Sequence, residues 1–429
     1  MPDYKELGLD QNMRALSSLS NSAYLTERDF KQYIDDRVRN VRRPGGLDFQ
    51  AVKNTSLGYQ AVVGKDNTGG AFTDLEDALK YIGGIGGGKI LMLPGTYTYS
   101  GTYFNIPSNT SIEGLSPNSV IINGNNSYFR LQVLGSSSVR LKNLNLINCS
   151  TINASILLFH ADDVEVESCK FQNNTRDIWG SYSALSTIKN CTSTLSGTFV
   201  SWDHSRPGNI FNNNFIDGGS IGFHGGTTSS GGGFSEYSNN HFQPRGTDQV
   251  VVSFFTGNFV SSTIRNNTQS LSGTKATYSD PIYNIFSPNT STVGPSISNN
   301  RIDTSGGITC KQLLRLTTND TSVSGNIILS LTAGSSNVVE LGSAYRCTFT
   351  GNTIVNGNQQ SWGNTLHLIA SSRNAITGNF FSTAGTSPGY NINIADSGCV
   401  ANAVVGNSLW IGTINDSGTR SVVANNAFS

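Results

Sequence analysis

The chain has 429 residues, of which only 13% are charged, and its 28 basic and 28 acidic residues balance to a net charge of zero. With no basic patch and no run that interleaves basic and aromatic residues, nucleic acid is not an expected partner. No stretch of about 18 apolar residues is present, so insertion into a membrane is not expected.

Residues 1–55 are predicted to form a helical arm, distinct from a main domain at 56–429. The first residues are charged and lack an apolar stretch, so we expect no secretory signal peptide. Thr26 and Asp29 form a pair typical of a helix start, and Pro44 ends the helix. Between them, apolar residues recur at helical spacing: Phe30, Tyr33, Ile34, Val38 and Val41. Such a stripe needs an apolar partner, either the chain's own main domain or a docking or oligomerisation partner.

A second short helix is predicted to cap the start of the main domain. Thr73 and Glu76 form a capping box, with the Thr73 hydroxyl at the N-cap, and Gly83 and Gly84 end the helix. Its apolar face holds four residues: Leu75, Ala78, Leu79 and Ile82. A glycine-rich turn and an apolar strand over residues 89–93 follow.

The rest of the chain carries an internal repeat of the form apolar–x–(Gly/Asn)–Asn–x–apolar. From Asn300 the repeat advances by 26, 26, 27 and 28 residues to reach Asn326, Asn352, Asn379 and Asn407. A period of this length predicts a solenoid, in which each repeat buries its apolar face against its neighbours. Short runs of alternating apolar residues indicate strands, and no long helical stretch follows residue 82. We therefore predict an all-β fold, a parallel β-helix of roughly 12 coils.

The repeated asparagine is predicted to turn a tight corner with left-handed backbone angles and to stack its amide in a hydrogen-bonded ladder. The ladder is predicted to extend upstream through other residues in the same frame: Leu144, Cys169, Cys191, Asn213, Asn240 and Asn267. The step from Asn267 to Asn300 is 33 residues, which predicts a loop around 274–281.

The six cysteines are scattered, without the spacing of a metal site, and we interpret all of them as small buried hydrophobic residues. No cluster of acidic residues suited to calcium is present either. Neither a metal nor a cofactor is predicted.

The capping helix, the glycine-rich turn, the apolar strand and the sequence Pro94-Gly95-Thr96-Tyr97 together resemble the start of the pectate-lyase-like right-handed β-helix superfamily. Residues 106–114 resemble its next turn. The resemblance covers roughly residues 56–429 and implies a right-handed β-helix. It does not imply one function, because the fold hosts lyases, hydrolases, epimerases and non-enzymatic phage tailspikes.

The run from Ser201 to His204, with Trp202 and Asp203 between them, is similar to the Trp-Ile-Asp-His motif of pectate lyases but lacks the residue between Trp and Asp. The family's Arg-x-Pro-x-x-Arg motif is missing as well. The lyase catalytic residues are therefore not transferred to this chain.

Aromatic and histidine residues recur 10 or 11 residues after the predicted ladder positions. Trp179 lies 10 residues after Cys169, Trp202 lies 11 after Cys191, and His224 lies 11 after Asn213. This spacing predicts a sugar-binding face formed by four residues: Trp179, Trp202, His204 and His224. The alternative is that Trp202 faces the core and His224 is an ordinary surface residue.

Carboxylates on neighbouring coils, about 4.8 Å apart, could serve hydrolysis. The candidate catalytic residues are Asp203, Asp217 and Asp248. Further carboxylates are interpreted mostly as solvated turn residues: Asp162, Asp163, Glu236, Asp280 and Asp303.

Three functions fit these features. The favoured hypothesis is a phage tail fibre or tailspike, or the equivalent in a related injection particle. It forms a homotrimer, docks to a virion tail or baseplate protein through residues 1–55, and recognises host-surface polysaccharide, with degradation of that polysaccharide left open. The second is a stand-alone polysaccharide lyase or glycoside hydrolase, and the third is a purely structural virion protein. Because ladder sequence continues to the last residues, we also expect copies of the chain or a partner to cover that end.

Overall fold

The computed structural model describes residues 58–428 except for short stretches at 66–70, 151–153, 205, 219–220, 227–232, 244, 247–252, 271, 274–276, 279–280, 287–292, 305–308, 311, 331–336, 358–362 and 384–388. The predicted arm at 1–55 lies outside the described residues. Within the described part, no helix is long and apolar enough to cross a membrane.

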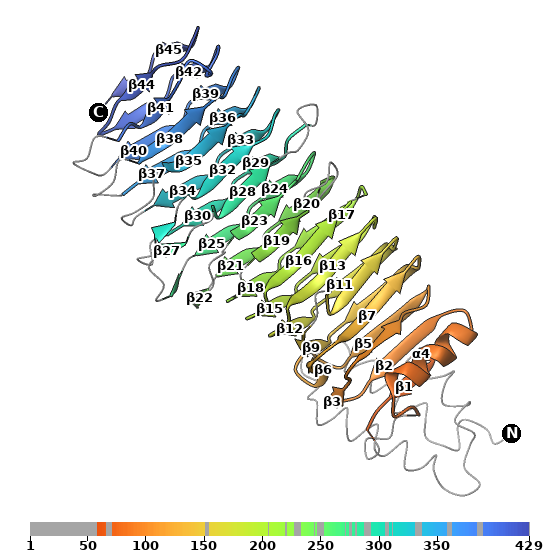
Figure 1. Ribbon diagram of the computed structural model, residues 1–429. Helices are drawn as coiled ribbons and strands as arrows, with labels where there is room; N and C mark the ends of the chain where they lie inside the picture. The colour runs from red at the N-terminus through yellow and green to blue at the C-terminus, as the bar shows by residue number, and fades with distance from the viewer. Residues whose placement is uncertain are drawn as a thin grey trace, which may run out of the picture.

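The chain winds into a solenoid whose coils each add one strand to three long parallel sheets (Figure 1). Sheets A, B and C contain 15, 14 and 13 strands, slightly more than the roughly 12 coils predicted. Each strand inside a sheet bonds to the strands one coil before and after it, so a paired strand residue has a partner at the same place on the next coil. The all-β parallel β-helix expected from the repeat is confirmed.

Sheet A contains β1 (Ala61–Val63), β2 (Gly88–Met92), β5 (Thr110–Gly114), β8 (Ser137–Lys142), β11 (Asp162–Glu167), β14 (Thr187–Lys189), β17 (Asn209–Asn212), β20 (Ser235–Ser238), β24 (Thr263–Arg265), β29 (Ser296–Ser298), β33 (Ser322–Ser324), β36 (Thr348–Thr350), β39 (Ala375–Thr377), β42 (Ala403–Val405) and β45 (Val422–Ala424). Sheet B contains β3 (Gly95–Thr98), β6 (Val120–Ser127), β9 (Asn145–Cys149), β12 (Lys170–Gln172), β15 (Thr192–Thr194), β18 (Phe215–Asp217), β21 (His241–Gln243), β25 (Thr268–Ser270), β30 (Arg301–Asp303), β34 (Ile327–Ser330), β37 (Thr353–Asn356), β40 (Phe380–Thr383), β43 (Ser408–Trp410) and β46 (Ala427–Phe428).

Sheet C contains β4 (Thr102–Asn105), β7 (Phe129–Leu134), β10 (Ile156–Phe159), β13 (Arg176–Ser181), β16 (Thr198–Asp203), β19 (Ile221–Gly225), β23 (Ser253–Gly257), β28 (Tyr283–Phe286), β32 (Leu314–Thr317), β35 (Asn337–Gly342), β38 (Asn364–Ile369), β41 (Ile392–Ile394) and β44 (Ile414–Asp416). Two small sheets pair β22 (Arg245–Gly246) with β26 (Ser272–Gly273), and β27 (Thr277–Tyr278) with β31 (Thr309–Cys310). Strands β26 and β27 belong to the long coil in which the loop around 274–281 was predicted.

Helix α4 (Leu75–Gly84) lies across the first coils, beside β1 and β2 (Figure 1). All four residues of its predicted apolar face are buried. The N-cap is Asp74 rather than Thr73, and its Oδ1 accepts a hydrogen bond of 2.6 Å from the Glu76 N–H. A carboxylate suits this place because the start of a helix exposes N–H groups and carries partial positive charge.

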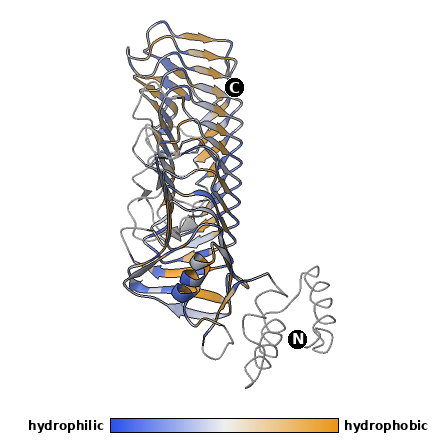
Figure 2. Cartoon of the chain, turned by 90° about the vertical axis from the view of Figure 1, so that its right-hand side faces the viewer, coloured by the Kyte–Doolittle hydropathy of each residue, from blue (hydrophilic) through white to orange (hydrophobic). Residues whose placement is uncertain are grey.

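The strands alternate buried and exposed side chains, which gives the solenoid one continuous apolar interior (Figure 2). In β5, for example, Thr110, Ile112 and Gly114 point inward while Ser111 and Glu113 are half-exposed. The core is therefore a column that lengthens with each coil.

The predicted asparagine ladder runs along one corner of the solenoid. The Asn326 backbone N–H and Nδ2 both donate to Asn352 Oδ1 at 2.9 Å, and Nδ2 also donates to the Ile297 carbonyl of the preceding coil. The left-handed backbone belongs to the residue before the ladder position, for example Gly325 with φ 64° and Asn299 with φ 55°. The two roles that we assigned to one asparagine are therefore divided between two adjacent residues.

The ladder position upstream of Asn240 is Asn214, not the predicted Asn213. The Asn214 Oδ1 accepts from the Cys191 N–H at 3.0 Å, whereas Asn213 forms the left-handed corner with φ 53°. Cys191 and Cys169 do occupy the ladder, because their thiols donate to carbonyls of the preceding coil as the asparagine amides do. The ladder position that we predicted from the sequence was thus wrong by one residue at this coil.

Five cysteines are buried free thiols, as predicted: Cys149, Cys169, Cys191, Cys347 and Cys399. The side chain of Cys310 lies outside the described residues.

Candidate functional site on sheet C

The one-residue correction changes which residues share a face of sheet C. Counted from Cys169, Cys191 and Asn214, the residues ten places later are Trp179, Ser201 and His224. These three are direct neighbours in the register of β13, β16 and β19. Trp202 comes one place after Ser201 and points to the opposite side, because a shift of one residue moves a strand side chain to the other face.

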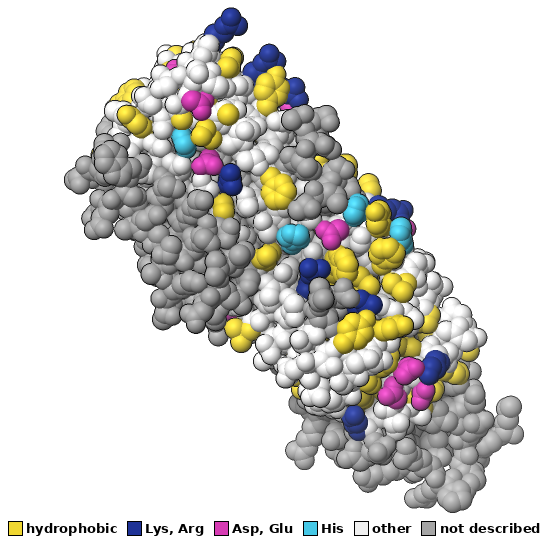
Figure 3. Space-filling model, in the orientation of Figure 1, with side chains coloured by type: hydrophobic (Ala, Val, Ile, Leu, Met, Phe, Trp, Pro, Cys, Tyr) yellow, Lys and Arg dark blue, Asp and Glu magenta, His cyan; other side chains and the backbone are white. Residues whose placement is uncertain are grey.

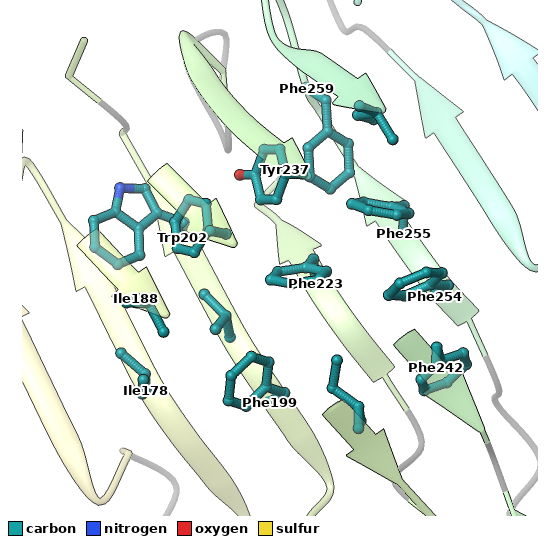
Figure 4. Packing of buried hydrophobic residues seen from close by; sticks show 14 of the residues in the cluster. Ile178, Ile188, Phe199, Trp202, Phe223, Tyr237, Phe242, Phe254, Phe255 and Phe259 are labelled. Carbon is teal, nitrogen blue, oxygen red and sulfur yellow. The ribbon is translucent and has the colours of Figure 1, made fainter. Parts of the chain in front are cut away.

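Trp202 therefore lies in the core, and its predicted role in sugar binding is wrong. Its side chain is only 1% exposed, and its ring packs edge-on against Phe211 with the centroids 5.2 Å apart. It belongs to a column of buried aromatic rings that includes Phe199 and Phe223 (Figure 4). On the neighbouring coil Gly180 pairs with Trp202, and a Cβ atom at Gly180 would lie 2.4 Å from the indole Cε3.

We expect Gly180→Ala to lower the free energy of unfolding by about 2 kcal/mol, because the added methyl group overpacks the core against the Trp202 ring. The matched control is Gly342→Ala on β35, where a Cβ would meet only ordinary contacts, at 3.4 Å and beyond. Urea unfolding followed by circular dichroism measures both variants. Equal midpoints for the two would show that the core accommodates the methyl group at Gly180.

Trp179 is half-buried on the outer face, and two charged residues fix its ring. The indole Nε1 donates a hydrogen bond of 2.9 Å to Asp203 Oδ2 on the next coil. The Arg176 guanidinium carbon lies 5.4 Å from the ring centroid, in cation–π range. An aromatic face held in this way is a rigid platform for an apolar ligand surface such as a sugar ring.

His224 lies one coil beyond Ser201, and its ring has a defined tautomer. Its Nδ1 is 3.2 Å from the Ser201 Oγ and accepts from the Gly226 backbone N–H at 3.4 Å. Because a backbone N–H can only donate, Nδ1 is unprotonated and Nε2 carries the proton. Burial lowers the pKa of His224 below its ordinary value; the nearby Asp203 carboxylate opposes this shift and Arg176 adds to it. His224 is therefore neutral near pH 7 and offers an Nε2–H donor.

His204 lies at the corner that follows sheet C, not on the row of Trp179 and His224. The rings of His160 and Tyr182 stack with centroids 4.8 Å apart, and those of Tyr182 and His204 stack at 4.5 Å. We did not predict this stack. The sequence did contain a sign of it, because Tyr182 lies 13 residues after Cys169 and His204 lies 13 residues after Cys191.

The predicted catalytic carboxylates are not brought together. Asp203 ends β16 in sheet C, whereas Asp217 ends β18 in sheet B, before β19 begins, and is only 7% exposed. The length of a sheet C strand, roughly 16 Å, separates them. That exceeds the 5 to 9.5 Å or so between the paired carboxylates of glycosidases. Asp248 lies outside the described residues.

The interpretation of the other described candidate carboxylates as solvated turn residues is wrong, because all of them lie in strands β11, β20 and β30, where each forms an ion pair. The pairs are Asp162–Arg206, Asp163–Arg140, Glu236–Arg265 and Asp303–Arg301. Asp280 lies outside the described residues. Among the side chains that the structure describes, no three His, Cys, Asp or Glu residues are grouped to hold a metal ion.

The fold is shared with several solved structures, although no protein-family model and no curated sequence matches the chain. Tailspike protein 3 of bacteriophage CBA120 has a TM-score of 0.58 at 14% identity over 85% of this chain. This chain spans only 61% of that tailspike. A tailspike double mutant of E. coli bacteriophage HK620 has a TM-score of 0.50 at 12% identity, over 93% of this chain and 84% of that one.

The A-module of the mannuronan C-5 epimerase AlgE6 from Azotobacter vinelandii has a TM-score of 0.52 at 13% identity. The alignment covers 83% of this chain and 94% of that module. At such identities the likeness establishes architecture alone. The chain thus has the right-handed parallel β-helix fold that tailspikes and this epimerase share, as the resemblance at its N-terminal coils implied.

Proposed function

We propose that the chain is a tailspike-like protein that binds a polysaccharide on the outer face of sheet C, over β13, β16 and β19. The observation that carries this proposal is the Trp179 ring, half-buried and fixed between Arg176 and Asp203, with the Nε2–H donor of His224 one coil further on. Sugars present apolar ring faces and many hydroxyl groups, and this surface offers a partner for each.

The geometry favours binding over cleavage. Hydrolysis needs two carboxylates a short distance apart, and the predicted partner of Asp203, Asp217, lies at the end of a strand of another sheet. The Asp203 Oδ2 is occupied by the Trp179 indole. His224 is a neutral imidazole whose Nδ1 already accepts hydrogen bonds, so it is arranged to donate from Nε2 rather than to remove a proton.

The wider proposal follows the likeness to tailspikes. In it, the chain forms a homotrimer in the virion tail and attaches to a tail or baseplate protein through residues 1–55. Light scattering tests the trimer, and a monomer at micromolar concentration would contradict it. The second candidate function is a stand-alone polysaccharide lyase or glycoside hydrolase; in its favour, the fold is also that of an enzyme that acts on a polysaccharide, the AlgE6 A-module.

One experiment separates these functions. The purified chain is incubated with surface polysaccharides from candidate hosts, and bound glycan, new reducing ends and unsaturated products are measured. Binding of intact glycan supports the tailspike-like binding protein. Release of new ends supports a degrading chain, either a depolymerising tailspike or a stand-alone enzyme, which the light-scattering test then separates. The absence of both binding and cleavage contradicts the proposal.

Trp179→Ala is expected to weaken glycan binding about 30-fold, the loss typical of an aromatic residue at the centre of a binding site. The matched control is Trp410→Ala, because Trp410 is 48% exposed on sheet B, away from this face. Isothermal titration with the bound polysaccharide measures both. Equal losses, or no loss at Trp179, would place the binding surface elsewhere.

A further inference from the structure

A second polar group lies on the outer face of sheet C, nearer the C-terminal end. Arg315, Glu340 and His367 are direct neighbours in the register of β32, β35 and β38. The Arg315 Nε lies 3.3 Å from Glu340 Oε1. The Glu340 and His367 side chains are only 15% and 16% exposed, so these polar groups are largely enclosed.

Hydrogen bonds determine the tautomer of His367. The Asn364 backbone N–H donates to Asn337 Oδ1 at 3.2 Å, which fixes the orientation of the Asn337 amide. Its Nδ2 must then donate to His367 Nδ1, 2.9 Å away. His367 Nδ1 is therefore unprotonated, and Nε2 carries the proton. This is the tautomer found at His224.

The two groups on sheet C contain the same three residue types in the same order of coils, although Arg176 and Asp203 lie on different register rows from His224. An arginine, a carboxylate and a histidine come from three consecutive coils: Arg176, Asp203 and His224 in the first group, and Arg315, Glu340 and His367 in the second. The histidines lie on one register row and are separated by five coils, about 24 Å at the 4.8 Å spacing of strands. Figure 3 shows histidine side chains beside basic and acidic ones at several places on the face turned to the viewer.

In both groups the carboxylate is used within the protein. Asp203 Oδ2 accepts from the Trp179 indole, and Glu340 Oε2 accepts from Gln312 and Asn337. Among the described residues, no group accepts a hydrogen bond from the terminal nitrogens of Arg315 or from His367 Nε2. The polar atoms left for a ligand are thus N–H donors, which pair with acceptors.

We propose that Arg315, Glu340 and His367 form a second glycan site, and that one anionic polysaccharide with carboxylate-bearing sugars spans both sites. A carboxylate is the acceptor that a guanidinium binds best, through two parallel hydrogen bonds. Glu340 holds Arg315 in place and does not contact the ligand. This inference rests on the proposed polysaccharide-binding function and specifies the class of ligand and its length.

The test uses the full chain with polymannuronate and polygalacturonate, each as a long polymer and as short oligomers, and uncharged dextran for comparison. Long polyuronate is expected to bind at least tenfold more tightly than short oligomers, because two linked sites act together. Arg315→Met is expected to remove this gain and leave the weak binding of short oligomers at the first site. Arg315→Lys, which keeps the charge but not the paired donors, is expected to restore part of it.

Arg265→Met is the matched control, because Arg265 also pairs with a carboxylate, Glu236, but on sheet A. Circular dichroism and thermal unfolding verify that each variant is folded. If the wild-type chain binds glycans but Arg315→Met and Arg265→Met bind long polymer equally, the second site is wrong while the proposed function stands. Binding of dextran or a host polysaccharide without either polyuronate overturns the anionic class. If no polysaccharide of any kind is bound, the proposed function itself fails.

Discussion

Replacing Asn326 with alanine is expected to lower the free energy of unfolding by about 4 kcal/mol. Its side chain is 1% exposed, and its Oδ1 accepts from both the backbone N–H and the Nδ2 of Asn300 at 2.9 Å. Alanine leaves that N–H buried without this partner and removes the bond from Nδ2 to the Ile297 carbonyl. Each buried group that loses its partner costs about 1–3 kcal/mol.

Asn326→Cys tests the mechanism, because Cys191 occupies the same ladder with its thiol bonded to the Val166 carbonyl. We expect cysteine to lose less stability than alanine. Asn118→Ala, at an exposed position, is the surface control. The urea concentration at the midpoint of unfolding ranks the three variants by stability. If Asn326→Ala and the surface control had the same midpoint, the ladder would not contribute to stability.

Asp177→Asn is expected to stabilise the protein above pH 7 by as much as about 4 kcal/mol. Asp177 is buried on β13, where Oδ1 accepts from Asn174 Nδ2 at 2.9 Å and Oδ2 accepts from Ser193. Burial raises its pKa from 3.8 to about 7, although the hydrogen bonds from Ser193, Asn174 and Ser196 oppose the shift. Asparagine removes the charge; its Oδ1 accepts from Asn174 Nδ2, and its Nδ2 donates to the Ser193 hydroxyl, which becomes the acceptor.

The sign of the pH dependence follows from the raised pKa. Below pH 3.8 the carboxyl is protonated in both the folded and unfolded states, so wild type and variant are equally stable. Between pH 3.8 and about 7 the unfolded state loses the proton first, which progressively lowers wild-type stability. Above pH 7 the folded state is ionised as well, and the difference between wild type and variant levels off.

Unfolding of wild type and Asp177→Asn across pH 4 to 9 measures this difference, with the exposed Asp416→Asn as the control. The control is expected to follow wild type at every pH. A constant difference between wild type and Asp177→Asn over the whole range would mean that Asp177 does not titrate in this window.

The sequence alone determined the architecture, because a solenoid repeats its constraints. The spacing from Asn300 to Asn407 required coils of similar length, and alternation required strands with one buried face. The buried face of α4 also follows from local spacing. These features depend on neighbours in the chain or on the same position one coil away, so they can be recognised in the sequence alone.

The tertiary structure decided what the outer face of sheet C presents. Trp202 lies 11 residues after its ladder position and Trp179 lies 10 after its own; counting His224 from Asn213 instead of Asn214 made its offset 11 as well, so that Trp202 was assigned to the outer face when it lies in the core. Strand side chains alternate, so a face can be assigned only when the register is known to the residue. Likewise, the sequence could not show that Arg315, Glu340 and His367 share one register row with His224, because the coils between them vary in length and only hydrogen-bonded pairing aligns them.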